Sequence, residues 1–511
     1  MKIPIVTLVF ILLSNFAFSQ TTDELKEFDQ FVKAGIEAWE VPGLAVSVVK
    51  DGKVVFSEVY GVRNIETGEK VNTETMFAIG STTKALTAYC IALLVDEGKL
   101  SFTDKVTDHY PGFQLADPYV TRELQIGDLL THRAGLANAD YLWVMTDFTS
   151  EELIDRMKYA KPAYSFRSDF IYQNIMYAVA GEIIHHVSGK PWWEFMQERI
   201  FDPLNMKHTI AKTCLLDKSE ISSNHVMPHY KFEDGFETID FMVADQIGAA
   251  GSVWASIDDM AKWTKFMLDS AIIGGKKLLS KEVFEELFKP QTIISKSKFY
   301  PTAKLTKPNW TTYGYGWFQH DYMGRMVNFH TGSLSGLVAI IGLLHEDKLG
   351  VYVMGNADHV ELRHAIMYKA FDLFVTGGNR NWNEEIQNLY RQIREESTKK
   401  KKKDEANRVE NAKPAHPLVN YTGRYTSPMW GDITILLEDA YLYLQSSPSV
   451  KLKMDHWHYD TFKTISDSRF HWLSDFEITF NTDAGGKIVS AVFWENHFKK
   501  VDGGKTNNKI K

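Results

Sequence analysis

The residues best suited to chemistry are Ser81 and Lys84, in the tetrapeptide Ser81-Thr82-Thr83-Lys84 at the start of an apolar stretch that runs to Leu94. If this stretch is a helix, positions i and i+3 share a face, so the Lys84 amine can reach the Ser81 hydroxyl. Burial and the positive end of the helix dipole both lower the pKa of the amine, and a neutral amine can accept the serine proton. The pair is a candidate nucleophile with its activator.

The Ser-x-x-Lys pattern occurs four times in this chain, so its surroundings must select among the matches. Ser47 lies in an apolar, strand-like run, where positions i and i+3 point to opposite faces. Ser295 and Ser397 lie in polar, lysine-rich stretches, where we expect solvated lysines. Only Ser81 precedes an apolar helix. The alternative interpretation is that Ser81 or Thr82 serves only as a helix N-cap.

Two further motifs supply candidate partners for the serine. Tyr172-Gln173-Asn174 is the only Tyr-x-Asn sequence in the chain, and it opens a stretch to Gly189 that we predict to be helical. His330-Thr331-Gly332 ends a predicted strand before the turn 332–336, and backbone N–H groups at such an edge can bind an anion. In the alternative, these side chains are ordinary polar residues of the core, the surface or a strand end.

The order of the predicted elements indicates how these motifs are positioned. An N-terminal helix is followed by a hairpin of residues 44–49 and 54–60, with Asp51-Gly52 as a type I′ turn. Residues 81–289 are mostly helical, and strands return at 315–318, 326–329, 337–341 and 351–354, before a helix at 361–374. This order predicts an α/β (α+β) fold, in which one sheet is built from both ends of the domain beside a helical subdomain.

The composition changes after residue 376. Residues 377–416 are charged and favour a solvated helix or linker, including the lysine run 399–403. Residues 417–505 contain short alternating strands and turns, which predict a small antiparallel β domain, and residues 506–511 form a basic tail. The larger domain, which contains the motifs above, then spans residues 20–376.

Length and charge restrict the class of protein. With 511 residues, 44% hydrophobic residues and a formal net charge of -8, we expect a folded protein of more than one domain. Nucleic acid is not expected as a partner, because phosphate binding needs a concentrated basic face. Cys90 and Cys214 are the only cysteines, so we expect a large core rather than disulfides to stabilise the fold.

Residues 1–19 have the charged start, short apolar core and small final residues of a secretory signal peptide. The mature chain would begin at Gln20, which predicts a secreted or periplasmic protein. The apolar core is short for a membrane anchor, and no later segment is long enough to span a bilayer. The oligomeric state is left open.

In order and spacing, these motifs resemble those of the serine β-lactamase and penicillin-binding-protein superfamily, most closely its class C β-lactamase, D,D-peptidase and esterase branch. Residues 129–136 (LLTHRAGL) are similar to the LLTHxSGL signature of that branch, 250–256 (AGSVWAS) to its AGGxxST loop, and 313–317 (YGYGW) to its YGxGW strand. The resemblance covers about residues 41–374. It implies an antiparallel sheet flanked by helices.

The resemblance also implies roles for individual residues. Ser81 would be the acylated nucleophile, Lys84 its activator, and Tyr172, wholly or partly as phenolate, the general base and the acid to the leaving group. Asn174 would hold the acyl-side amide of the substrate, and His330, Thr331 and Gly332 would also bind the substrate. The backbone N–H groups of Ser81 and Ser333 would form the oxyanion hole. No metal or other cofactor is expected, and we interpret His456 and His458 as structural.

One departure from the family pattern concerns the substrate. Where β-lactamases of this type carry a lysine, this chain has His330, which is mostly neutral at pH 7. We therefore expect hydrolysis of an ester, an amide or a small peptide rather than efficient hydrolysis of penicillins. The alternatives are a true class C-like β-lactamase and a non-catalytic binding or scaffold protein that retains the fold.

Overall fold

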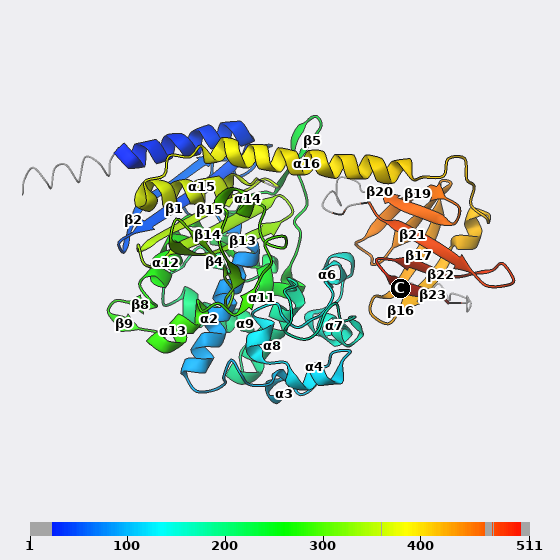
Figure 1. Ribbon diagram of the computed structural model, residues 1–511, viewed down its shortest axis with the longest axis horizontal. Coiled ribbons are helices and arrows are strands. Elements are labelled where there is room, and N and C mark those ends of the chain that lie inside the picture. Colours follow the sequence, from blue (N-terminus) through cyan, green and yellow to red (C-terminus); the bar gives the residue numbers. More distant parts are fainter. Residues whose placement is uncertain (1–22, 359, 466–472, 474, 502–511) are drawn as a thin grey trace, which may run out of the picture.

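The computed structural model describes residues 23–358, 360–465, 473 and 475–501, which form a large mixed domain and a small β domain (Figure 1). The predicted signal peptide, residues 1–19, lies outside the described residues. Within the described ranges, none of the helices combines the length and the apolar character needed to cross a bilayer.

An eight-stranded antiparallel sheet forms the centre of the large domain, in the order β10-β11-β12-β13-β14-β15-β1-β2. Its strands are β1 (Gly43–Lys50), β2 (Lys53–Gly61), β10 (Thr292–Ile293), β11 (Thr311–Tyr313), β12 (Phe318–Tyr322), β13 (Arg325–Leu334), β14 (Leu337–Leu344) and β15 (Leu349–Gly355). Asp51 (φ 49°) and Gly52 (φ 74°) join β1 to β2 with the two positive φ angles of a type I′ turn. Because β1 pairs with β15, the predicted sheet built from both ends of the domain is confirmed.

Helices cover both faces of this sheet. On one face lie the helix over residues 23–39, α15 (Leu362–Phe371) and the start of α16 (Trp382–Ala406), along the top of Figure 1. Phe28, Ile366 and Trp382 from these three helices are fully buried in one core with the sheet. On the other face α12 (Ile257–Leu268) packs on β1 and β15.

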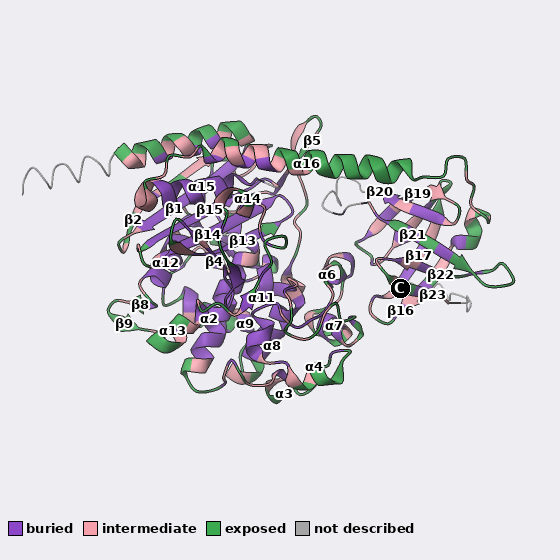
Figure 2. Cartoon of the chain, viewed as in Figure 1, coloured by how far each residue is buried: buried purple, intermediate pink, exposed green. Residues whose placement is uncertain are grey.

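The helical subdomain is built around α2 (Thr83–Asp96), α8 (Asn174–Ser188) and α11 (Gly248–Gly251), which contact one another. Apolar residues occupy every face of α2, so it is buried along nearly its whole length (Figure 2). The other helices of the large domain are α3 (Val106–His109), α4 (Pro118–Glu123), α5 (Ile126–Leu129), α6 (Tyr141–Met145), α7 (Ser150–Arg156), α9 (Trp192–Met196), α10 (Glu220–Ser223), α13 (Lys281–Leu287) and α14 (Ala303–Thr306).

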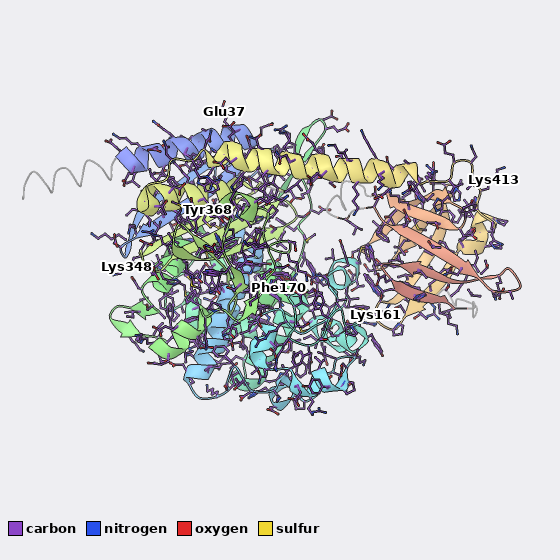
Figure 3. All side chains as sticks on the ribbon, viewed as in Figure 1. Glu37, Lys161, Phe170, Lys348, Tyr368 and Lys413 are labelled. Carbon is purple, nitrogen blue, oxygen red and sulfur yellow. The ribbon has the colours of Figure 1, made fainter. Side chains whose placement is uncertain are left out.

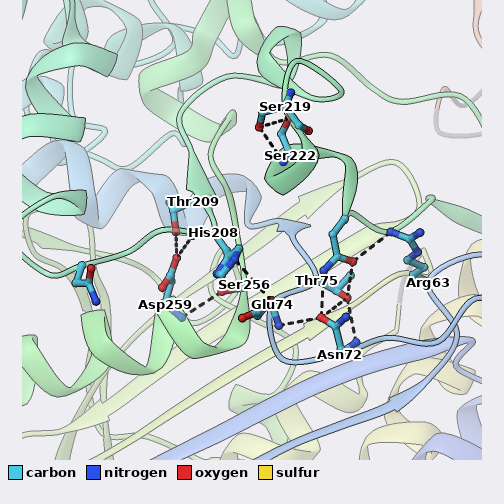
Figure 4. A network of polar contacts seen from close by, with 12 residues as sticks. Arg63, Asn72, Glu74, Thr75, His208, Thr209, Ser219, Ser222, Ser256 and Asp259 are labelled. Carbon is cyan, nitrogen blue, oxygen red and sulfur yellow. Dashed lines mark hydrogen bonds and ion pairs between the residues drawn. The ribbon is translucent and has the colours of Figure 1, made fainter.

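A small sheet of three strands holds the segment that leads to Ser81; its strands are β3 (Phe77–Ala78), β7 (Trp254–Ala255) and β4 (Thr209–Ile210). The buried Asp259 carboxylate accepts hydrogen bonds from the His208 backbone N–H (2.7 Å) and the Thr209 hydroxyl (2.9 Å) (Figure 4). Thr75, just before β3, belongs to a second polar cluster in the same view. These bonds satisfy buried polar groups and hold β4, which is joined through β7 to β3, the strand in front of the serine. Two hairpins complete the domain: β5 (His229–Phe232) with β6 (Gly235–Thr238), and β8 (Ile272–Ile273) with β9 (Lys276–Lys277).

The C-terminal domain is a closed antiparallel barrel of eight strands. They are β16 (Gly423–Ser427), β17 (Gly431–Glu438), β18 (Tyr441–Gln445), β19 (Lys451–His458), β20 (Thr461–Ile465), β21 (Glu477–Thr482), β22 (Ile488–Phe493) and β23 (Asn496–Lys500). The predicted antiparallel β domain is confirmed. Its closure comes from the pairing of β16 with β23, where Tyr425 lies opposite Lys500, a long-range contact that leaves no edge strand.

The barrel contacts the large domain directly as well as through α16, whose second half is exposed (Figure 2). Tyr141 on α6 stacks on Trp494 of the barrel, with ring centroids 4.4 Å apart. Polar side chains of each domain also bond backbone carbonyls of the other: Lys161 (labelled in Figure 3) to Glu495 at 2.9 Å, Arg156 to Pro428 at 3.0 Å and Ser446 to Met145 at 2.6 Å.

Two predicted boundaries are wrong. The strand expected from residue 315 begins only at Phe318, because Gly316 has a φ of 82° and makes a turn. A Cβ atom on Gly316 would lie 2.9 Å from the carbonyl oxygen of Lys84, so the turn packs against the helix that carries the lysine. The helix expected from Tyr172 begins at Asn174, because Gln173 is extended (φ -145°, ψ 107°).

Candidate active site

Ser81 lies in a single 3-10 turn, η1 (Gly80–Thr82), between β3 and α2. No side chain caps the start of η1 or of α2, and the Thr82 hydroxyl donates back to the Ile79 carbonyl at 2.9 Å. The N-cap alternative therefore does not describe Ser81. Its Oγ instead accepts a hydrogen bond from Lys84 Nζ at 3.1 Å, as the i, i+3 spacing predicted.

Lys84 is completely buried and donates to three acceptors. Besides Ser81, these are Asn174 Oδ1 at 2.6 Å and the Ala250 carbonyl at 2.9 Å. Burial lowers the pKa of the amine to about 7, while the negative charge of Asp140 acts in the opposite direction. A substantial fraction of the amine is therefore neutral near pH 7 and able to accept a proton.

Asp140 completes a chain of hydrogen bonds that the sequence did not reveal. Its Oδ2 accepts from Asn174 Nδ2 at 2.8 Å, and its Oδ1 accepts from the Asn174 backbone N–H at 3.1 Å. Burial raises the pKa of the Asp140 carboxyl, and the bonds from Asn174 and the charge of Lys84 oppose that rise. Both ends of the Asn174 amide are thus occupied by Lys84 and Asp140. In the sequence, Asp140 could have been noticed only as an acidic residue in the loop just after the motif 129–136.

Tyr172 lies beside Ser81 and Lys84. Lys84 Nζ is 4.7 Å from the centroid of its ring, and its phenol shares a hydrogen bond with the Ser81 hydroxyl. Burial raises the pKa of Tyr172 well above its ordinary value, and the bond to Ser81 offsets only part of this. The resting form is a neutral phenol, so this environment does not favour the phenolate that the resemblance implied.

His132, quoted in the motif 129–136 but given no role, supports Tyr172 from behind. Its ring centroid is 4.3 Å from that of Tyr172, and its Nδ1 accepts the Gln173 backbone N–H at 3.1 Å. Burial and the charge of Lys84 lower the pKa of His132 well below its ordinary value. The imidazole is neutral, and it holds the extended peptide that precedes Asn174.

His330 lies on β13 next to these groups and is 1% exposed. Its Nδ1 is 2.6 Å from the Thr331 carbonyl oxygen and must donate to it, which leaves Nε2 to accept the Tyr313 hydroxyl at 2.9 Å. Burial and the charge of Lys84 lower the pKa of His330 to about 3. The side chain is neutral at physiological pH, and both ring nitrogens already have partners.

The backbones of η1 and β13 touch at the residues for which the resemblance implied an oxyanion hole. A Cβ atom on Gly80 would lie 2.7 Å from the Ser333 backbone nitrogen. One on Gly332 would lie 1.9 Å from the Ile79 carbonyl oxygen and 3.0 Å from the Ser81 backbone nitrogen. Only glycine fits at these two positions, and the Ser81 and Ser333 backbone nitrogens both lie at this contact between η1 and β13.

Arg363 fixes the end of β13 and was not found from the sequence. This buried guanidinium on α15 donates from Nη1 to the Gly332 carbonyl at 2.6 Å and to Ser333 Oγ at 2.9 Å, and it pairs with Glu361 at 3.2 Å. Thr331, beside it, bonds the Tyr300 hydroxyl. The strand edge beside Ser81 is therefore held from behind by side chains with little freedom.

In the described part of the chain, no group of three or more His, Cys, Asp or Glu side chains could hold a metal ion. His456 and His458 both lie on β19, and His456 Nε2 bonds the Tyr459 carbonyl at 2.8 Å. The site that the structure assembles is thus made of Ser81, Lys84, Tyr172 and their hydrogen-bonding partners.

A serine, a buried lysine and a tyrosine between an antiparallel sheet and a helical subdomain define a serine hydrolase. Comparison with known families agrees. The profile described as Beta-lactamase matches residues 28–372, about two thirds of the chain, and the protein belongs to this family. A second profile, Domain of unknown function (DUF3471), matches residues 407–505, which contain the barrel.

Curated relatives and solved structures extend this likeness. Unguisins hydrolase ungD of Aspergillus violaceofuscus is 24% identical over 81% of this chain and 77% of its own length. Protein flp of Staphylococcus aureus is 24% identical over 66% of this chain and 64% of its own. The octameric penicillin-binding protein homologue from Pyrococcus abyssi has a TM-score of 0.61 at 23% identity, covering 93% of this chain and 99% of its own. SurE has the same fold. Its structure has a TM-score of 0.57 at 17% identity and covers 94% of this chain and 100% of its own. SurE has also been solved with D-Leu.

Proposed function

We propose that this protein hydrolyses an ester or amide bond of a small acyl or peptide substrate through an acyl-enzyme on Ser81. The observation that carries the proposal is the buried Lys84 amine, 3.1 Å from Ser81 Oγ, whose pKa is lowered to about 7. An amine that is partly neutral and already bonded to a hydroxyl can accept its proton as the oxygen attacks.

The remaining steps follow from the neighbouring groups. As Ser81 Oγ attacks the acyl carbon, Lys84 takes its proton, and the developing oxyanion binds the Ser81 and Ser333 N–H groups, each worth about 3 kcal/mol in such sites. The neutral Tyr172 phenol donates a proton to the leaving group, and Lys84 restores that proton. Water then hydrolyses the acyl-enzyme. The Asn174 amide links Asp140 to Lys84, because its Nδ2 donates to the carboxylate and its Oδ1 accepts from the amine.

The substrate proposal rests on the neutral strand edge. A neutral, fully bonded His330 gives no cation for the carboxylate of a penicillin. The relative named as an unguisins hydrolase supports hydrolysis as the reaction. We also propose that residues 1–19 direct the protein out of the cytoplasm.

A β-lactamase is the second candidate, because the matching family carries that name. Turnover of nitrocefin that is fast and is lost in Lys84→Ala would favour it over the ester or peptide hydrolase. A panel of p-nitrophenyl esters, D-amino-acid amides, D-Ala-D-Ala peptides and nitrocefin separates these two activities.

The mechanism itself is tested by covalent labelling. We expect a fluorophosphonate probe to label the wild type on Ser81, and Ser81→Ala to abolish the label and to reduce kcat/KM for p-nitrophenyl esters by about 10⁴-fold or more. Ser295→Ala is the matched control, because Ser295 belongs to another Ser-x-x-Lys match but is exposed. A folded wild type that is not labelled, and that turns over no member of the panel, would leave a binding or scaffold role.

A further inference from the structure

A cavity of about 470 Å³ lies where the barrel meets the large domain. Its walls come from α6 and the loop after it, from residues 240–246, from the β13–β14 turn and from the barrel: Trp143, Val144, Thr146, Asp147, Asp240, Phe241, Met242, Val243, Gln246, Ser335, Ser449 and Val450. The barrel thus supplies part of a cavity wall that neither domain forms alone.

This cavity adjoins the nucleophile through two short chain segments. Ser335 is two residues from Ser333, a distance of at most about 7 Å along the chain. Trp143 is three residues after Asp140, the carboxylate that bonds Asn174. A group bound in the cavity is therefore within reach of an acyl chain attached to Ser81, because a residue of extended peptide spans about 3.3 Å.

The cavity wall is apolar with an acidic side. Trp143, Met242 and Val450 provide apolar surface, whereas the exposed carboxylates of Asp147 and Asp240 carry negative charge. Among the ion pairs of the described residues, none involves either carboxylate. Asp147 Oδ1 accepts the Ser449 hydroxyl of the barrel at 2.6 Å. This combination suits an apolar side chain next to a cation, and it disfavours an anionic ligand.

Two polar atoms in the same wall have no hydrogen-bond partner among the residues that the structure describes. They are the indole N–H of Trp143, a residue that is 8% exposed, and the side-chain oxygen of Gln246. Buried polar groups normally form hydrogen bonds, so a bound group that supplied partners to these two atoms would satisfy them. A peptide group offers one acceptor and one donor, the complement of these atoms. Both are covered in the unliganded protein, so pairing them requires a side-chain rotation on binding.

We propose that this cavity binds the acyl side of a peptide substrate, with an apolar side chain against Trp143 and Val450 and a protonated amino group beside Asp147 and Asp240. The inference rests on the proposed acyl-enzyme at Ser81, and it adds a substrate class: short peptides with a free, cationic N-terminus near an apolar residue. The barrel then acts in substrate selection, through Ser449 and Val450.

The test compares the p-nitrophenyl esters of Leu-Gly-Gly, of N-acetyl-Leu-Gly-Gly and of acetate, with the full-length protein. The ratio of kcat/KM for the free-amine peptide ester to that for the acetate ester is the readout. We expect Asp147→Asn/Asp240→Asn to lower this ratio about tenfold, with a smaller effect on the N-acetyl ester, because a charge-assisted contact is lost. Val450→Ala lowers the ratio about fivefold, since two buried methyl groups are removed.

Asp234→Asn, an exposed acidic residue on the β5–β6 turn, is the matched control and keeps the wild-type ratio. Ser449→Ala separates the effect of the carboxylate charge from the effect of the contact between the domains. It removes the hydrogen bond to Asp147 but leaves the carboxylate in place. If the double variant hydrolyses all three esters in the wild-type proportions, the cavity proposal is overturned while the Ser81 mechanism stands. If the wild type shows no Ser81-dependent turnover of even the acetate ester, both are overturned.

Discussion

At Lys84, two opposing electrostatic effects set the protonation state of the amine that bonds Ser81. Burial lowers the pKa of the amine, and the Asp140 carboxylate, bonded to Asn174, raises it. The result, about 7, lies well below the ordinary 10.5 of lysine. The unfolded chain therefore binds more protons than the folded one between these values, so this residue makes the free energy of unfolding increase with pH across that window. Burial of Lys84 thus lowers the stability of the folded protein, but it leaves an amine that can act as a base near pH 7.

The pH profile tests this arrangement. We expect kcat/KM for ester hydrolysis to rise with pH through about 7, as Lys84 loses its proton. His330, with a pKa of about 3, stays neutral over that range and cannot cause the rise. Asp140→Asn removes the charge that raises the lysine pKa, so the rise moves to lower pH, and kcat falls about tenfold because Asn174 loses its anchor.

The control for this measurement is Asp155→Asn, an exposed carboxylate on α7 that pairs only with Lys158 among the described residues. It should leave the profile in place. A profile for Asp140→Asn that moves to higher pH, or does not move, would contradict the assigned interaction between Asp140 and Lys84.

Between elements, the decisive contact is the one between η1 and β13. Gly80 and Gly332 let two backbones approach until side chains no longer fit, and Arg363 holds the strand from behind. Backbone N–H donors stabilise an oxyanion effectively only when they are already in position. A shift of β13 therefore lowers activity more than its effect on stability suggests.

Gly332→Ala puts that contact to the test. Its Cβ would lie 1.9 Å from the Ile79 carbonyl oxygen, so the strand or the turn has to move. We expect kcat/KM to fall about 100-fold or more, and thermal unfolding to show a loss of about 1–3 kcal/mol. Gly355→Ala on β15, where the nearest atoms are side-chain carbons at 3.3 Å, should cost far less activity. Equal effects of the two variants would argue against a special role for the η1–β13 contact.

For the whole molecule, the barrel is docked on the part of the large domain that borders the site. α6 starts one residue after Asp140, and its first residue, Tyr141, stacks on Trp494 of the barrel. The same helix lines the cavity between the domains. α6 therefore joins the loop that carries Asp140 directly to the contact with the barrel.

Tyr141→Ala weakens this docking by about 1 kcal/mol, because an aromatic stack is lost. We expect faster hydrogen exchange in residues 428–431 and 446–450 of the barrel and a larger radius of gyration by X-ray scattering, with little change in the core of the large domain. Tyr159→Ala, which removes another exposed tyrosine of the same subdomain, is the control. Unchanged exchange in both barrel loops would show that the other interdomain bonds suffice.

Much of this architecture could be predicted from local sequence patterns. Alternating and helical periodicities show which face an element buries, and this was enough to place β1 and β2 in one sheet with the later strands. The i, i+3 spacing put Lys84 beside Ser81 for the same local reason. Boundaries were less accurate: Gln173 and Gly316 interrupt predicted elements through backbone angles that no periodicity encodes.

The sequence by itself determined that Lys84 meets Ser81, because the spacing on one helical turn fixes this contact, and that position 330 carries a histidine, a residue type that is mostly neutral at pH 7. Only the tertiary structure decided that Asp140 bonds Asn174, that His132 supports Tyr172, that the barrel closes and that it shares a cavity with α6. These contacts join residues tens or hundreds of positions apart. Their energies depend on burial and distance in the folded chain, and neither quantity exists until the elements have packed.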